Sequence, residues 1–170
     1  AYAAISMQTA YLKVNYPLEF AVGLLTSVMD DSKKLMKYVN SYRAMGVNIL
    51  PPDVRNSEYG FSIEEDKNKN ESIRFGLFAL KGVGEEIATS IPKERKKRSY
   101  EDIEDFVTRH LDFNKKAFES FAKSGALDSF GYTRHTLVEN LGDILNNIKK
   151  ANKNIDKGHL TLFDIGLEKP

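Results

Sequence analysis

Apolar residues recur at helical spacing through most of the chain, which predicts a mainly α-helical fold. The first third of the chain predicts three helices, at Tyr2–Val14, Leu18–Met29 and Lys33–Met45. Pro17 separates the first two, because a proline is tolerated only in the first turn of a helix. Asp30-Asp31-Ser32 should cap the third helix, and Gly46 suits the position just past its end.

Between residues 47 and 77 the pattern changes from helical to extended. Val47–Leu50 is short and β-branched, and Pro51-Pro52-Asp53 favours an extended path. Phe61–Ile63 and Ile73–Leu77 alternate with a period of two, and they flank the polar stretch Glu64–Glu71. This arrangement predicts a small β-hairpin with a long, mobile tip.

Helical spacing returns after Leu77. The predicted helices are Gly84–Ile91, a segment from Ser99 through Val107, Asn114–Lys123 and Thr133–Lys150. The first should stop near Pro92, Ser99 should cap the second through Asp102, and Gly125 should end the third. Ala151–Gly158 is rich in Asn and Lys and lacks an apolar stripe, which predicts a flexible linker.

The segment Leu77–Ile91 carries the most informative pattern, L-x-x-L-K-G-V-G-x-x-x-A-x-x-I, which is typical of helix-hairpin-helix motifs that bind DNA without reading its sequence. Gly82 and Gly84 permit positive φ and a close approach of a ligand to the backbone. The helix that opens at Gly84 presents unpaired N–H groups, and such donors suit a phosphate oxygen. Leu80, Val83 and Ile87 should pack the hairpin, and Ala88 is small where its helices would cross. The alternative interpretation is a turn that serves packing only.

The candidate DNA-binding residues lie in this hairpin and in the basic run after it. They are Lys81, Gly82, Val83, Gly84, Lys93, Arg95, Lys96, Lys97 and Arg98. Glu85 and Glu86 sit beside the proposed phosphate and weaken its binding, an effect that Lys81 and the basic run could offset. The alternative for the basic run is a solvated loop. Lys115–Leu127 resembles a second, degenerate hairpin with a single glycine, and we expect it to bind phosphate less well than the first.

Composition sets limits on the other functional classes. The chain has 25 Lys+Arg and 24 Asp+Glu, for a net charge of +1, which argues against a strongly basic nucleic-acid binder. It has no Cys, which excludes disulfides and thiolate zinc sites and favours a reducing cytoplasm. Its three His are scattered, so no dedicated His metal site is expected. No apolar run approaches the ~20 residues that cross a bilayer.

Several segments resemble, in order and spacing, the alpha subunit of bacterial DNA polymerase III, a C-family replicative polymerase. They are Ala1–Phe20, Met45–Val54, Ile73–Leu77, Lys81–Gly84 and Ser124–Asp128. The resemblance implies the end of the fingers region and a bacterial, cytoplasmic protein. It also implies that the Mg²⁺-binding palm carboxylates of the parent nucleotidyltransferase lie upstream, so this chain should hold no catalytic residue and no cofactor. Because the chain opens without Met inside a helical pattern, we expect a piece of a longer protein.

The resemblance also assigns a role to the tail. In the family, a short peptide with a pattern like Gln-x-x-Leu-Phe follows the hairpins and binds the sliding clamp. Here that place is taken by His159, Leu160, Thr161, Leu162 and Phe163. Exposed Leu and Phe after a linker are suited to an apolar groove. The alternative is that Leu160–Phe163 folds back onto the domain.

The predicted fold is therefore mainly α with a small β-hairpin, a helical bundle followed by a tandem helix-hairpin-helix domain. The expected division is 1–52 for the helical end of the fingers, 53–77 for the extended segment and hairpin, 78–150 for the DNA-binding domain, and 151–170 for the linker and clamp-binding peptide. The expected partners are duplex DNA, the sliding clamp and other replicative polymerase subunits, without a membrane. The alternative functions are a non-enzymatic DNA-repair or junction-binding module and a packing scaffold for other subunits.

Overall fold

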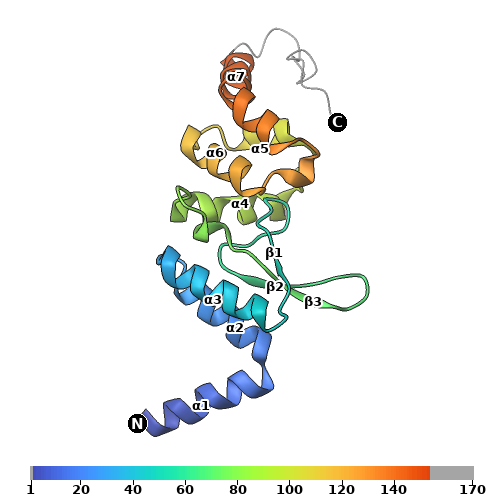
Figure 1. Ribbon diagram of the computed structural model, residues 1–170. Coiled ribbons are helices and arrows are strands. Elements are labelled where there is room, and N and C mark those ends of the chain that lie inside the picture. The colour runs from blue at the N-terminus through green and yellow to red at the C-terminus, as the bar shows by residue number, and fades with distance from the viewer. Residues whose placement is uncertain (1, 154–170) are drawn as a thin grey trace.

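The computed structural model of the chain describes residues 2–153. The N-terminal helices, a small sheet and the remaining helices follow one another along an elongated molecule (Figure 1). The mainly α fold with a small β part is confirmed. The helices and strands are α1 (Tyr2–Asn15), α2 (Pro17–Ser27), α3 (Ser32–Ala44), β1 (Ile49–Leu50), β2 (Ser62–Glu65), β3 (Glu71–Arg74), η1 (Leu77–Ala79), α4 (Glu85–Lys97), α5 (Ile103–Arg109), α6 (Lys115–Ser124), η2 (Asp128–Phe130) and α7 (Arg134–Lys153).

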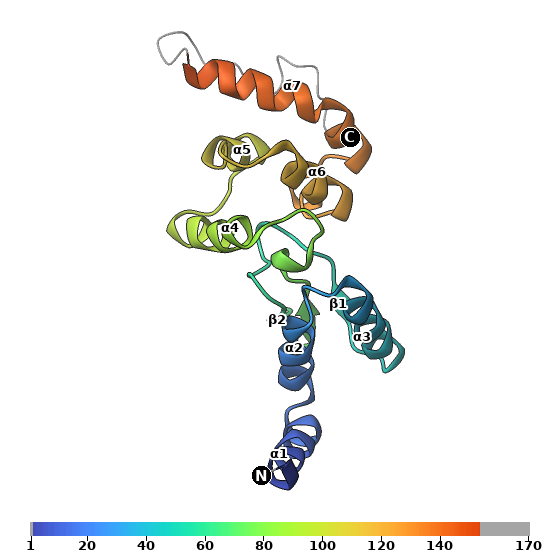
Figure 2. The same cartoon turned by 90° about the vertical axis from the view of Figure 1, so that its left-hand side faces the viewer.

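The first three helices begin and end close to where the sequence predicts. Pro17 occupies the first turn of α2. The Asp31 carboxylate accepts hydrogen bonds from the backbone N–H groups of Lys33 and Lys34, both at 3.1 Å, and so caps α3. Gly46 follows α3 with φ of +86°, as a residue past a helix end should. α1 extends away from α2 and buries none of its side chains (Figure 2).

The predicted hairpin is confirmed and has a third strand beside it. β2 and β3 are antiparallel, with Ile63 opposite Ile73, and β1 pairs in parallel with the other edge of β3. The strands continue into the stretch expected to be a loop, so the predicted tip was too long. The reason is Asp66, whose carboxylate accepts from the backbone N–H groups of Asn68 at 2.7 Å and Asn70 at 2.9 Å and closes a short turn.

Two clusters of buried side chains hold the fold together. The first, the N-terminal core, joins α2 and α3 to the sheet through Ala21, Leu25, Met29, Leu35, Val39, Ile49, Phe61 and Ile73. The second, the C-terminal core, joins α4–α7 and includes Phe106, Phe118 and Phe121. Tyr59 and Phe78 stack with their ring centroids 5.0 Å apart and pack against both clusters. This stacked pair is therefore a point of contact between the two cores.

Three predicted helix boundaries are wrong. α4 does not stop near Pro92 but runs through it to Lys97. A proline inside a helix costs ~3 kcal/mol, and burial of its ring together with contacts made by the last turns of α4 offsets that cost. α5 is capped by Asp102, which accepts from the Asp105 N–H at 2.8 Å, and not by Ser99. α7 extends to Lys153, so the first three residues of the predicted linker are helical.

A buried histidine lies in the C-terminal core. His110 is 2% exposed, and its Nε2 lies 2.7 Å from the hydroxyl oxygen of Tyr100. The Tyr100 hydroxyl donates to the carbonyl of Ile91 at 3.0 Å, and the ring of Phe113 stacks on the imidazole with centroids 4.4 Å apart. Burial in these apolar surroundings lowers the pKa of His110 to about 4.

Acid should therefore destabilise the fold through His110. In the unfolded chain its pKa returns to ~6.5, so between that value and about 4 the unfolded state binds a proton that the folded state does not. The free energy of unfolding should therefore fall by up to about 3 kcal/mol as the pH drops from 6.5 to about 4. Urea unfolding at pH 7, 5.5 and 4.5 measures this free energy. His110→Gln should flatten the pH dependence, whereas the control His135→Gln, at an exposed position of α7, should keep it. Equal slopes for H110Q and the wild type would contradict this assignment.

Candidate nucleic-acid interface

The predicted glycine hairpin is present, and its two glycines have different backbone conformations. η1 is a single 3₁₀ turn, and the segment from Leu80 to Gly84 links it to α4. Gly82 has φ of +92°, as expected. Gly84 is the N-cap of α4 with φ of −77° and ψ of 166°, so the expectation of positive φ there is wrong. A Cβ at Gly84 would meet no atom within 4 Å, so the space in front of it is open.

Apolar side chains hold this hairpin against the C-terminal core, while the N–H groups at the start of α4 stay without partners in the helix. Val83 and Ala88 are buried, and Leu80 and Ile87 pack against the C-terminal core, as predicted. The Val83 N–H donates to the Leu80 carbonyl at 3.1 Å and closes the turn. The first N–H groups of α4 have no partner within the helix and carry partial positive charge. The hairpin can therefore offer several backbone donors to one anion beside Gly84.

The predicted second hairpin, Lys115–Leu127, contains α6 and the single glycine that ends it, Gly125 with φ of +84°. The turn that leads into α6 resembles the loop of the first hairpin, with Phe113 in the place of Val83 and Asn114 in the place of Gly84 at an offset of 30, and we count it as part of the second hairpin. Phe113 is buried like Val83, and its N–H donates to the His110 carbonyl at 3.0 Å, the counterpart of the Val83 bond. Asn114 caps α6 through the Ala117 N–H at 2.8 Å. Asp112 and Asn114 stand where the first hairpin has glycines.

The basic run forms the last turns of α4 and not a loop. Arg95 is held inside the fold, where its guanidinium donates to the carbonyls of Val54 at 3.0 Å and Ser57 at 2.8 Å and pairs with Glu58 at 2.7 Å. Three of the other four members form ion pairs: Arg98 with Glu101 and Asp105, Lys97 with Glu94, and Lys96 with Glu58, where Nζ and a carboxylate oxygen lie 3.7 Å apart. Lys93 is exposed. Among residues 2–153, Lys81 and Lys93 are thus the predicted cations that make no ion pair.

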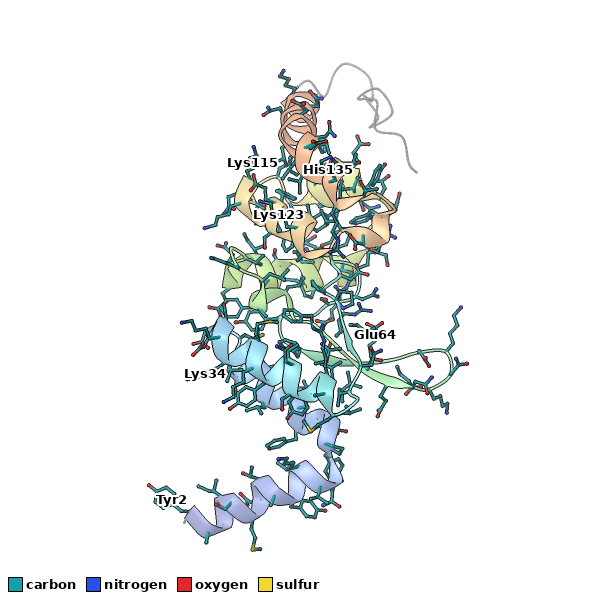
Figure 3. The ribbon with its side chains drawn as sticks, viewed as in Figure 1. Tyr2, Lys34, Glu64, Lys115, Lys123 and His135 are labelled. Carbon is teal, nitrogen blue, oxygen red and sulfur yellow. The ribbon has the colours of Figure 1, made fainter. Side chains whose placement is uncertain are left out.

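Sequence reasoning missed Lys116 as a neighbour of the glycine loop. A Cβ on Gly82 would lie 3.3 Å from Cε, 3.4 Å from Cγ and 3.7 Å from Cδ of Lys116, so the aliphatic stem of this lysine runs along the loop. One turn later on α6, the Ser120 hydroxyl donates to the Lys81 carbonyl at 2.8 Å. Figure 3 labels two other lysines of the same helix, Lys115 and Lys123, and both are exposed. The i,i+4 spacing puts Lys116 and Ser120 on one face of α6, but it does not indicate that this face meets the Gly82 loop.

Other predicted features can be placed only in part. His159–Phe163 lie outside the described residues. Within residues 2–153, no group of three or more His, Asp or Glu side chains is arranged to hold a metal ion. The same part of the chain contains no helix that is both long and apolar enough to cross a membrane.

Comparison with known proteins agrees with this geometry. A family profile described as the helix-hairpin-helix motif matches residues 46–137. The chain belongs to the helix-hairpin-helix family. It is also similar to DNA polymerase III subunit alpha of Helicobacter pylori, with 43% identity over 148 residues that cover 83% of this chain and 12% of that protein. The corresponding protein of Deinococcus radiodurans is 43% identical over 148 residues, 85% of this chain and 11% of the relative. That of Borreliella burgdorferi is 37% identical over 166 residues, 96% of this chain and 14% of the relative.

These matches confirm the resemblance to the polymerase III alpha subunit over most of this helix-hairpin-helix chain. The chain spans between 11% and 14% of the length of these three relatives.

Arg95 should be a stability residue and not a phosphate contact. Arg95→Met keeps the aliphatic stem but leaves the Val54 and Ser57 carbonyls without their donor, which should lower the free energy of unfolding by about 2–4 kcal/mol. The matched control is Lys93→Met, two positions before Arg95 on the same helix and exposed, which should change the free energy of unfolding by less than ~0.5 kcal/mol. Urea unfolding measures both. An R95M variant as stable as K93M would contradict the structural role.

Proposed function

We propose that this chain binds the phosphate backbone of duplex DNA through its first hairpin, as part of a bacterial DNA polymerase. The observation that carries the proposal is the open backbone at Gly84, which caps α4 without any atom in front of it. Membership in the helix-hairpin-helix family and similarity to polymerase III alpha subunits support it. The repair or junction-binding alternative uses the same hairpin, and the relatives favour the polymerase.

The proposed contact with DNA would depend more on neutral backbone N–H donors than on the net charge of the chain. Backbone N–H groups of the hairpin and the first turn of α4 would bind phosphate oxygens, while exposed Lys81 and Lys93 add positive charge nearby. Contacts to phosphate carry no base information, so binding should be largely independent of sequence. It should weaken as salt rises, because each neutralised phosphate releases counterions. A net charge of +1 is compatible with this mode of binding.

Gly84→Val tests the phosphate contact without disturbing the fold. The extended φ and ψ of Gly84 suit a β-branched residue, and the new side chain would occupy only the space where a phosphate would bind. We expect the duplex affinity to fall at least about tenfold, because one bulky group blocks several hydrogen bonds at once. Fluorescence anisotropy with a labelled duplex in 50 mM salt measures it.

The matched control is Gly23→Val in α2, where a Cβ would also meet no atom within 4 Å. This variant should bind duplex DNA like the wild type. Thermal melting of both variants shows whether they remain folded. Equal affinity of G84V, G23V and the wild type would refute the phosphate site.

We also propose that His159–Phe163 tethers the chain to a sliding clamp. The support is in the sequence, where Leu160, Leu162 and Phe163 follow an Asn/Lys-rich stretch. Each such side chain contributes ~1.5–3 kcal/mol when fully buried, and ordering a peptide consumes much of that, so micromolar affinity is sufficient. A tether raises the effective concentration of DNA at the hairpin, so modest contacts can hold the polymerase in place.

The tether is tested on the full chain with a bacterial sliding clamp. Leu162→Ala with Phe163→Ala should weaken clamp binding at least about tenfold, because two large apolar side chains leave the groove. The matched control is Thr161→Ala within the same peptide, which should keep most of the affinity. Isothermal titration calorimetry measures all three proteins. Failure of the wild-type chain to bind, or equal affinity of the double variant, would refute the tether.

The remaining assignments follow the same proposal. The relatives are bacterial polymerase subunits, so we assign the chain to the cytoplasm, where the DNA lies, and expect contacts with other replicative subunits. The chain spans between 11% and 14% of the length of these relatives, and we propose that polymerase chemistry and its Mg²⁺ belong to other parts of such a protein. A chain that binds neither DNA nor clamp would instead favour the packing scaffold.

A further inference from the structure

The first hairpin has one exposed cation of its own, Lys81, but two carboxylates stand beside its backbone donors. Glu85 and Glu86 form the first turn of α4, and both side chains are exposed next to the open space at Gly84. Carboxylates at that place suit the helix dipole but repel a phosphate. A phosphate held there by N–H groups would therefore gain from a second positive charge beside Lys81, supplied from another part of the fold.

The second hairpin has the opposite assignment of charges. At the offset of 30 residues, Lys115 and Lys116 stand where the first hairpin has Glu85 and Glu86, and Asp112 stands where it has Gly82. The exposed Asp112 carboxylate places a negative charge in the loop that would have to approach the phosphate. The second hairpin thus has basic residues next to a loop that repels phosphate. The first hairpin has a loop that can accept phosphate next to acidic residues.

The packing of α6 on the first hairpin brings the two halves together. The Lys116 stem lies along Gly82, with Cε 3.3 Å from the place where a Cβ would be, and Nζ is one bond farther. The Ser120–Lys81 hydrogen bond fixes the same face of α6 on the same loop. Because Gly82 has no side chain, the stem can pass next to the loop backbone.

Lys116 also differs from its neighbours on α6 in being unpaired. Lys115 and Lys123 both lie near the Glu119 carboxylate, at 4.0 Å and 3.5 Å. Within the part of the chain that the structure describes, Lys116 has no carboxylate within ion-pair distance. Its charge is therefore available to a ligand at the Gly82 loop.

We propose that Lys116 completes the phosphate site of the first hairpin, so that one DNA phosphate is bound by backbone donors of one hairpin and by a lysine of the other. This rests on the proposed function and names the side chain that contacts the backbone. The loop of the second hairpin takes no phosphate of its own, because Asp112 occupies it. The ligand is a nucleic-acid phosphodiester, and Lys116 adds affinity without reading the bases.

The test compares Lys116→Met with Lys115→Met in the full chain. Met keeps an unbranched apolar stem against Gly82 and removes only the charge. With a labelled random-sequence duplex at several salt concentrations, K116M should bind roughly two- to fivefold more weakly at low salt, as the loss of an exposed ion pair implies. Its slope of log affinity against log salt should fall by about one. K115M should keep the wild-type slope, and Lys116→Arg should restore it because the charge is retained.

The outcomes separate this inference from the proposed function. A wild-type chain that shows no salt-dependent duplex binding overturns both. A wild-type chain that binds, together with K116M and K115M of equal slope, overturns the role of Lys116 and leaves the hairpin function standing. A loss of slope in K116M that K116R also shows would indicate a steric effect of the substitution and would overturn the charge contact.

Discussion

The seating of α6 on the Gly82 loop is the contact on which the proposed site depends. Gly82 has φ of +92° and no side chain, so the loop can turn and the stem of Lys116 can pass beside it. Any larger residue would be strained there and would meet that stem at 3.3–3.7 Å. The Ser120–Lys81 bond then fixes the helix to the loop. One glycine thus sets both the shape of the first hairpin and its distance from the second.

Arginines brace the rest of the helical part from the inside. Arg95 donates to two carbonyls of the segment that follows β1, and Arg55 from that segment donates to the Ser129 carbonyl and lies 4.4 Å from the centre of the Phe130 ring. The Val54 N–H donates to the Ala126 carbonyl at 3.0 Å. The segment therefore ties α4 to the end of α6. Of the two arginines that look like DNA contacts in the sequence, Arg95 is occupied inside the fold and Arg98 is paired with carboxylates at the surface. In the proposed function, the phosphate contact therefore relies on lysines and the backbone.

Features fixed by local interactions could be predicted from the sequence. The Asp31 cap, Gly46 past α3 and Gly125 past α6 all depend on residues within one helical turn, and the alternation that forms β2 and β3 is equally local. Two errors are also local, namely the turn closed by Asp66 and the Asp102 cap of α5, and the others concern contacts between distant residues. Pro92 stays within α4 because the tertiary fold buries it, β1 pairs with a strand more than 20 residues later, and Arg95 finds carbonyls about 40 residues away.

The two glycines of the first hairpin need separate explanations. Positive φ and the nearby lysine stem account for Gly82 within the fold itself. Gly84 has ordinary extended angles, offers no side-chain cap to α4, and faces open space, whereas its counterpart Asn114 caps α6 with a side-chain hydrogen bond. Asparagine at position 84 would therefore stabilise α4 better than glycine does. Gly84 is therefore not the residue that would make α4 most stable, and it stands in front of unpaired N–H groups. The approach of a ligand to the backbone explains why a glycine is present there. In the proposed function, that ligand is a DNA phosphate.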